Sequence, residues 1–159
     1  MDICFPGDTK VQMWDGSKKA ISDVRKGDRI ITIDPATRRS TAAQVTAVMA
    51  HEAKNYAITR LVLLGAKEMP SPGGTMVYLS TRELNATPNH PVITAAGEKK
   101  MGEVKEGDEI MCFDKKTGVY QRFRVWTKTE QAGGLQQVYN IETGTGRTFI
   151  MNEVMVLQK

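Results

Sequence analysis

The chain has 159 residues, of which 40% are hydrophobic and 25% are charged, and it carries a net charge of +4. These proportions fit one globular domain with its own core and exclude a disordered or fibrous chain. No apolar run reaches the roughly 18 residues of a membrane helix, and the start lacks a signal-peptide pattern, so no membrane association is expected and the localisation stays unknown. The positive charges are dispersed among expected turns, which argues against nucleic-acid binding.

Short strands joined by Gly and Asp turns are predicted along the chain. Alternating apolar and polar residues predict a strand over 10–14, closed by the turn Asp15-Gly16. The β-branched residues of 29–33 predict the next strand, which ends at Asp34-Pro35. Further strands are predicted at 42–56, 56–62, 76–79, 84–87, 138–143, 147–151 and 154–157. The Pro- and Gly-rich residues 67–74 predict a loop, either a surface hairpin or a disordered tip. No segment has a sustained helical period, so the predicted fold class is all-β.

A repeat divides the chain into two related halves. Segment 20–30 is echoed by segment 100–110, so that Gly27 matches Gly107 at an offset of 80 residues. The same offset, without a gap, also matches Asp34 with Asp114. A unit this long that occurs twice indicates two similar halves of one β domain, because solenoid repeats are shorter and more numerous.

The two cysteines have different settings. They are too few for a disulfide framework and lack the close spacing of zinc or redox motifs, so no metal and no cofactor are predicted. Cys112 lies in the apolar run 110–113 and is predicted to be a core residue. Cys4 stands ahead of Phe5-Pro6-Gly7, a bend that would fix the direction of its thiol. It is therefore a candidate nucleophile, and the alternative is a buried structural cysteine.

His90 is the candidate proton donor. It follows Thr87-Pro88-Asn89, a turn in which proline fixes the backbone and would hold the histidine rigidly. The alternative is a turn histidine that is exposed or bonded to the backbone. His51 has no such setting and is predicted to be a surface residue.

In combination these features resemble the Hint superfamily, which comprises inteins, bacterial intein-like domains and the autoprocessing part of Hedgehog proteins. The segment Cys4–Thr9, the element Thr87–His90 and the duplicated halves carry the resemblance, which covers essentially the whole chain. It implies a horseshoe-shaped, pseudo-twofold β fold without an endonuclease insert, like a mini-intein or a bacterial intein-like domain. Residues 1–3 would then be a residual flanking segment and residues 4–159 the Hint domain.

The resemblance also implies a reaction at the peptide bond between Ile3 and Cys4. The Cys4 thiol would attack the carbonyl of Ile3 in an N-to-S acyl shift, and His90 would protonate the departing amine. Thr87 would bond the scissile amide. The thioester would be resolved by water or an external nucleophile, in a single turnover that needs no cofactor. The substrate is then the chain's own N-terminal flanking polypeptide, and the domain is expected to be a monomer.

The far end departs from the intein pattern. Inteins usually close with His-Asn, where the asparagine cyclises, whereas this chain has Leu157 and Gln158. Gln158 would cyclise more slowly through a six-membered ring, and an apolar Leu157 side chain cannot transfer a proton. Asn140 stands where many inteins have an aspartate, and Lys159 follows in place of an acceptor cysteine, serine or threonine. N-terminal cleavage is therefore predicted, and complete splicing is in doubt.

Two other functions stay open. A catalytically degenerate Hint fold could act as a structural or interaction module, which Leu157, Gln158 and Asn140 favour. A small basic β-domain could bind nucleic acid through Trp126 and its basic neighbours, but the aromatic residues are few and scattered.

Overall fold

The structure is a computed structural model that describes residues 4–54, 57–132 and 134–158. Within these residues the regular elements are strands and two short 3₁₀ turns, η1 (Ile21–Asp23) and η2 (Met101–Glu103). No helix in this part of the chain is long and apolar enough to cross a membrane. The strands in chain order are β1 (Phe5–Pro6), β2 (Lys10–Gln12), β3 (Lys18–Ala20), β4 (Arg29–Ile33), β5 (Ser40–Ala53), β6 (Ala57–Ser71), β7 (Gly74–Ala86), β8 (Pro91–Thr94), β9 (Gly97–Lys100), β10 (Glu109–Asp114), β11 (Val119–Ala132), β12 (Gln136–Thr143), β13 (Thr148–Met151) and β14 (Val154–Leu157). The predicted all-β class is confirmed.

The repeat in the sequence corresponds to two halves of similar build. η1 precedes β4 in the first half as η2 precedes β10 in the second, and each of these strands is followed by a long one, β5 or β11. Gly27 and Gly107 occupy equivalent turns with φ of 96° and 91°, a conformation that residues with a Cβ rarely adopt. Their N–H groups donate to the carbonyls of Val45 and Val125 at 2.8 and 2.9 Å. The duplication predicted from the repeat is therefore present in the fold.

An aspartate closes each of these turns. The carboxylates of Asp28 and Asp108 accept the backbone N–H three residues earlier, at 2.9 and 3.0 Å. Each also pairs with the lysine nine residues earlier, at 2.9 and 3.1 Å. The backbone bond, followed by the lysine contact, holds the pKa of both carboxyls below the usual value for aspartate.

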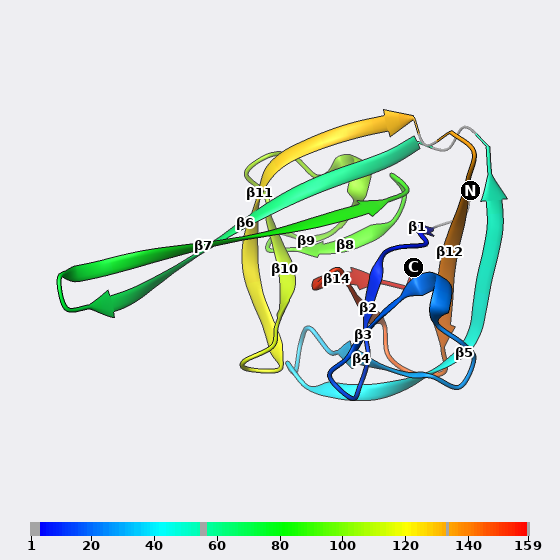
Figure 1. Cartoon of the computed structure of the whole chain (residues 1–159), viewed down its shortest axis with the longest axis horizontal. Helices are drawn as coiled ribbons and strands as arrows, with labels where there is room; N and C mark the ends of the chain where they lie inside the picture. The colour runs from blue at the N-terminus through cyan, green and yellow to red at the C-terminus, as the bar shows by residue number, and fades with distance from the viewer. Residues whose placement is uncertain (1–3, 55–56, 133, 159) are drawn as a thin grey trace.

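The two halves exchange strands. β5 of the first half pairs antiparallel with β12 of the second, and β11 of the second half pairs antiparallel with β6 of the first. Figure 1 shows these long strands curving around the body, with β1, β2 and β14 between them. This arrangement confirms the horseshoe-shaped, pseudo-twofold fold. Because of the exchange, neither half completes its sheet without the other.

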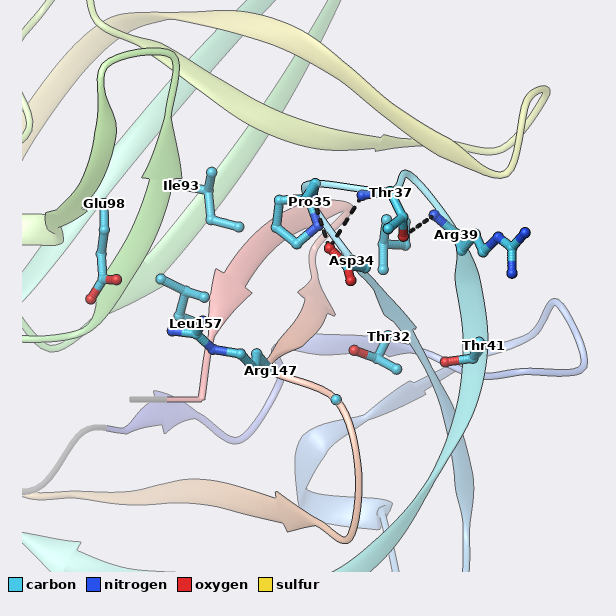
Figure 2. Close-up of a pocket in the computed structure, with 13 residues that line it drawn as sticks. Thr32, Asp34, Pro35, Thr37, Arg39, Thr41, Ile93, Glu98, Arg147 and Leu157 are labelled. Carbon is cyan, nitrogen blue, oxygen red and sulfur yellow. Dashed lines mark hydrogen bonds between the residues drawn. The ribbon is translucent and has the colours of Figure 1, made fainter.

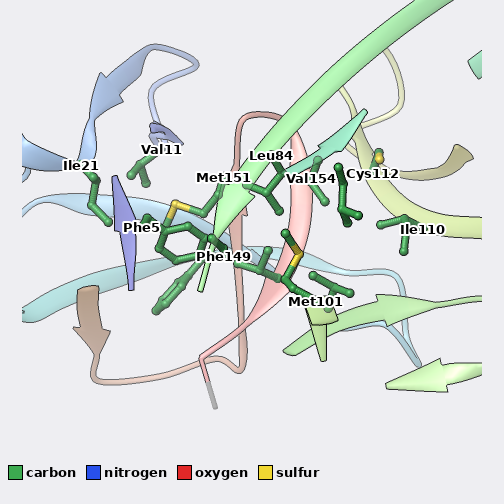
Figure 3. Packing of buried hydrophobic residues seen from close by; sticks show 14 of the residues in the cluster. Phe5, Val11, Ile21, Leu84, Met101, Ile110, Cys112, Phe149, Met151 and Val154 are labelled. Atoms are coloured by element: carbon green, nitrogen blue, oxygen red, sulfur yellow. The ribbon is translucent and has the colours of Figure 1, made fainter. Parts of the chain in front are cut away.

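Short interior strands supply much of the core. Figure 3 shows Phe5, Leu84, Phe149 and Met151 in one packed cluster, although they come from three different strands, β1, β7 and β13. β14 lies between this cluster and a second one on its other face, so all four residues of Val154–Leu157 are buried. Burial on both faces fixes the last strand firmly in the body.

The hairpin formed by β6 and β7 corrects one prediction. The sequence predicts a loop over 67–74, but β6 continues to Ser71, β7 begins at Gly74, and only two residues form the turn. Pro70 is tolerated in β6 because the pairing of β6 with β11 ends at Leu64. Beyond Leu64 the outer edge of β6 has no partner strand among the described residues, so it needs no N–H donor at position 70. The hairpin, one of the two predicted forms, is present with longer strands, and it projects from the body (Figure 1).

Gly65 lies at the base of this hairpin, where β6 passes a buried ring. A Cβ at position 65 would come within 2.7 Å of the Phe123 ring. The Arg82 guanidinium lies over that ring at 4.3 Å from its centroid. Arg82 also donates to the carbonyls of Phe113 and Glu153 at 2.6 and 2.7 Å, so the ring cannot move aside easily.

We expect Gly65→Ala to lower the free energy of unfolding by about 1–3 kcal/mol, because the added methyl overpacks the Phe123 site. Gly73→Ala is the matched control, since its new Cβ would meet nothing within 4 Å. Urea unfolding followed by circular dichroism measures both variants. Equal stability of the two would show that the Phe123 ring adapts at no cost.

Candidate active site

Cys4 and Thr87 are joined by two reciprocal hydrogen bonds. The backbone N–H of Cys4 donates to Thr87 Oγ1 at 3.1 Å, and the backbone N–H of Thr87 donates to the Cys4 carbonyl at 3.1 Å. Both residues are buried, and the Cys4 side chain packs with Ala53 and Val138. The Cys4 nitrogen belongs to the peptide bond that precedes the residue. The threonine hydroxyl therefore contacts that peptide bond directly; Ile3, on its other side, lies outside the described residues.

His90 lies three residues beyond Thr87 and is fully buried. Its N–H donates to the Thr87 carbonyl at 3.0 Å, which closes the turn. The imidazole ring packs on Phe5, with 4.3 Å between ring centroids and 53° between planes. Its Nε2 lies 3.1 Å from the carbonyl oxygen of Leu157. One ring thus contacts the residue after Cys4 and the end of β14.

The surroundings of His90 determine its protonation. Burial lowers its pKa to about 3, although the bond to the Leu157 carbonyl acts in the opposite direction. The ring is therefore neutral near pH 7. A carbonyl can only accept, so Nε2 carries the proton and Nδ1 carries the lone pair. Nδ1 is buried and has no hydrogen-bond partner among the described residues. It is the ring atom available to receive a proton.

The turn that follows Cys4 in the first half is equivalent to the turn that holds His90 in the second half. The Thr9 N–H donates to the Pro6 carbonyl at 3.1 Å, as the His90 N–H donates to that of Thr87. The Thr9 carbonyl then accepts from the first residue of η1, and the His90 carbonyl from the first residue of η2, both at 2.8 Å. Thr9 therefore occupies in the first half the place that His90 occupies in the second. The duplicated scaffold brings the Cys4 and His90 segments together.

Asn140 lies beside Cys4 across a strand pair. β1 pairs with β12 so that Phe5 opposes Tyr139, and one further step in this register places Cys4 opposite Asn140. The Asn140 Oδ1 accepts the N–H of Ile141 at 2.9 Å. An amide side chain in this position can form hydrogen bonds but cannot titrate.

His51 lies on the same face of this sheet and corrects another prediction. It pairs across β5 and β12 with Val138, whose side chain contacts Cys4. His51 is half-buried, although the sequence predicts a surface residue. The local sequence around His51 gives no signal for this position, because it depends on the pairing of two strands about 85 residues apart.

Gln158 is held away from the ring of His90 by its own contacts. Its side-chain nitrogen donates to the Thr143 hydroxyl and, at 3.2 Å, to the Gly146 carbonyl. Its backbone N–H donates to the Arg147 carbonyl at 2.9 Å, which extends the pairing of β13 with β14. The structure therefore brings the end of the chain to His90 through the carbonyl of Leu157 and not through the Gln158 amide.

Two contributors to the site are absent from the sequence prediction. Phe5 is the ring against which His90 packs, and its place beside Cys4 in the sequence could have suggested this. The Leu157 carbonyl is a backbone group, so no side-chain pattern reveals it. Cys112 is fully buried, as predicted, and burial raises the pKa of its thiol to about 12. That thiol is unsuited to nucleophilic attack.

A cavity of about 580 Å³ opens on the other side of Leu157. Figure 2 shows Ile93, Pro35 and Leu157 among the residues that line it, together with the charged residues Asp34, Glu98 and Arg147. Cys4, Thr87 and His90 do not line it. Nowhere in the described ranges do three or more His, Cys, Asp or Glu side chains gather in a group that could hold a metal ion.

A protein family matches the part of the chain that carries this site. The family model, described as Vint, a Hint domain, covers residues 3–99, which is more than half of the chain. Among curated proteins, the DNA-directed RNA polymerase subunit Rpo1N of Methanocaldococcus jannaschii is 28% identical over 160 residues. The match takes in 96% of this chain but only 10% of that subunit, so the chain spans about a tenth of this relative's length.

Solved structures match the fold over nearly its whole length. An intein from a hyperthermophile superposes with a TM-score of 0.75 at 19% identity, covering 99% of this chain and 100% of the other. A DnaB intein from Synechocystis gives 0.71 at 20% identity, covering 98% of both. A bacterial intein-like domain from Clostridium thermocellum gives 0.70 at 22% identity, covering 97% of both. With the family match, these similarities identify the chain as a member of the Hint-domain family, the family of protein-splicing-type autoprocessing domains, with the fold of an intein.

Proposed function

We propose that this domain forms a thioester at the Ile3–Cys4 bond by an N-to-S acyl shift and so releases the polypeptide that precedes Cys4. The bond from the Cys4 N–H to Thr87 Oγ1 is the observation that carries the proposal. It places a fixed polar group on the nitrogen of the bond to be broken. A structural turn does not require such a contact at a buried cysteine.

The acyl shift needs a proton to move from sulfur to nitrogen. The thiolate of Cys4 attacks the carbonyl carbon before it, the S–C bond forms, and the C–N bond breaks to leave the Cys4 amine. Neutral His90 accepts the thiol proton at Nδ1 and returns it to the departing nitrogen. Burial disfavours the imidazolium form, so the ring does not retain that proton. With its pKa lowered to about 3, His90 is a weak base whose protonated form is a strong acid, so it takes up the proton only transiently and delivers it to the departing nitrogen.

Thr87 and the turn around it position the reacting groups. The hydroxyl holds the amide N–H of Cys4, while the reciprocal backbone bond fixes the Cys4 carbonyl. Groups held in place before the reaction avoid the entropy cost of collecting them. Asn140, opposite Cys4, can add a hydrogen bond but no proton transfer.

The substrate is the flanking polypeptide of the same chain. The match to a tenth of a much longer polymerase subunit fits a domain embedded in a host protein, with polypeptide on both sides. Residues 1–3 are then the end of the upstream flank, and the domain extends over residues 4–159. Water or an external nucleophile resolves the thioester. The downstream cut is slower, because Gln158 must close a six-membered ring and its amide is bound by Thr143 and Gly146.

Removal of the Cys4 thiol tests the first step. We expect a stable protein fused before Cys4 to be released by dithiothreitol or hydroxylamine, which attack thioesters, and the release to be abolished by Cys4→Ala. Cys112→Ala is the matched control, because its buried thiol has a pKa of about 12 and takes no part. Gel electrophoresis and mass spectrometry of the fragments measure the cut. Cleavage that persists in Cys4→Ala would exclude the thioester, and no cleavage in the unmodified domain would favour a structural module.

The neutral state of His90 predicts how stability depends on pH. Its pKa of about 3 in the folded protein is below the unfolded value near 6.5, so between these values only the unfolded chain binds the proton. The stabilisation is complete above pH 6.5 and is lost as the pH falls toward 3. From pH 7 to pH 5 the free energy of unfolding should drop by about 2 kcal/mol.

The matched variant is His90→Gln, whose side-chain amide can still donate to the Leu157 carbonyl but does not titrate in this range. Urea unfolding at pH 7 and pH 5 should show the loss in the unmodified protein and little of it in the variant. Equal losses in both proteins would mean that His90 is protonated in the folded state.

Substitution at Gln158 tests the downstream step. With a stable protein fused after Lys159 and Cys4→Ala blocking the first step, we expect Gln158→Asn to cleave faster than the unmodified end. Asparagine closes a five-membered ring and is too short to keep both contacts with Thr143 and Gly146. Gln158→Leu, which has no amide, should not cleave. Mass spectrometry of the released fragment gives the site, and equal rates for glutamine and asparagine would show that cyclisation is not limiting.

A further inference from the structure

The outer part of the β6–β7 hairpin exposes apolar side chains that the proposed reaction does not use. Five of them are 41–65% exposed: Met69, Met76, Val77, Tyr78 and Leu79. The hairpin register places Met69 opposite Met76, so these two share a face with Tyr78, while Val77 and Leu79 lie on the other face. Among the described residues, both faces of this ribbon are therefore apolar and open to solvent.

The outer edge of β7 is also unprotected. In the part of the chain that the structure describes, β7 pairs with β6 alone, and its register runs without a bulge. No charged residue occurs from Met69 to Thr81. Proteins usually protect such an edge with lysine, proline or a bulge, because its N–H and C=O groups can pair with another strand. The segment Thr75–Ser80 has none of these.

We propose that this edge is an interface between two copies of the chain, in which β7 pairs antiparallel with β7 of a second copy about a twofold axis near Val77. In this pairing Met76 lies opposite Tyr78 of the partner subunit, and Val77 lies opposite Val77 of the partner subunit. Apolar side chains then meet on both faces of a four-stranded ribbon. An uncharged strand pairs with itself without repulsion, and a twofold contact closes after two copies.

The shape of the molecule allows this contact. The hairpin projects from the body, so the second body lies at the far end of the shared ribbon (Figure 1). β1, which follows the proposed reacting bond, lies in the body and away from the hairpin tip, so the proposed reaction does not occupy this edge. About seven residues pair per strand, a length of roughly 23 Å. A contact of this length is short compared with stable interfaces, which bury about 1,600 Å² in total, so we expect the monomer predicted from the sequence at low concentration and a reversible dimer at high concentration.

Introduction of a charge at Val77 tests the proposal, with sedimentation velocity over a range of concentrations as the measurement. The unmodified protein should shift from monomer to dimer as its concentration rises. Val77→Lys and Val77→Glu should each stay monomeric, because like charges then face each other across the axis. An equimolar mixture of the two variants should dimerise again. Met69→Lys, on the opposite edge of the same hairpin, is the matched control and should dimerise as the unmodified protein does.

Circular dichroism and urea unfolding confirm that each variant is folded. A monomer at every concentration of the unmodified protein would overturn the proposal. Dimers that persist in Val77→Lys, or that are lost in Met69→Lys, would place the contact elsewhere and also overturn it. Recovery in the mixture supports pairing about Val77. The test is independent of the proposed reaction, because cleavage is intramolecular and the hairpin tip contains no residue of the site.

Discussion

The paired hydrogen bonds between Cys4 and Thr87 are the contact on which the arrangement of the site depends. They join segments 83 residues apart, and each residue uses its backbone to hold the other. An isolated pair of such bonds contributes only about 1–3 kcal/mol, so it cannot by itself bring two distant loops together. The scaffold must place them, and the bonds then fix how Cys4 and Thr87 lie relative to each other.

Strand exchange is the device that places them. Because β5 pairs with β12 and β11 with β6, separation of the halves would break both long ladders at once. The interior strands β1 and β14 are held between these ladders, with Phe5 and Phe149 buried in one cluster. The site is therefore supported by pairing and apolar burial from both halves. This support explains how the segments of Cys4 and His90, which are joined through Thr87, are both kept buried in a small domain.

Local patterns in the sequence predict many of the strands and the duplication, but they miss β3, β8, β9 and the long β11. Local settings also single out Cys4 and His90 as candidates, whereas Thr87 follows from the resemblance to Hint domains. Turn glycines and aspartates, alternation and a repeat at a constant offset are all read within short windows. The Leu157 carbonyl and the placement of His51 could not be predicted, because the first is a backbone group and the second depends on the register of exchanged strands. The sequence predicts too short a hairpin because Pro70 and the glycines after it have the composition of a loop. The strand nevertheless continues through Pro70, since the unpaired outer edge of β6 tolerates a proline.

His90 has one further consequence for the order of events in the domain. Its Nε2–H donates to the Leu157 carbonyl at the end of β14, so the other ring nitrogen, Nδ1, carries the lone pair. If the last strand moved, the imidazole would lose the partner that selects its tautomer. The His90 ring thus contacts both ends of the domain, Phe5 near the start and Leu157 at the end of β14. In the proposed reaction, the acyl shift at Cys4 would therefore not begin before β14 has folded into place.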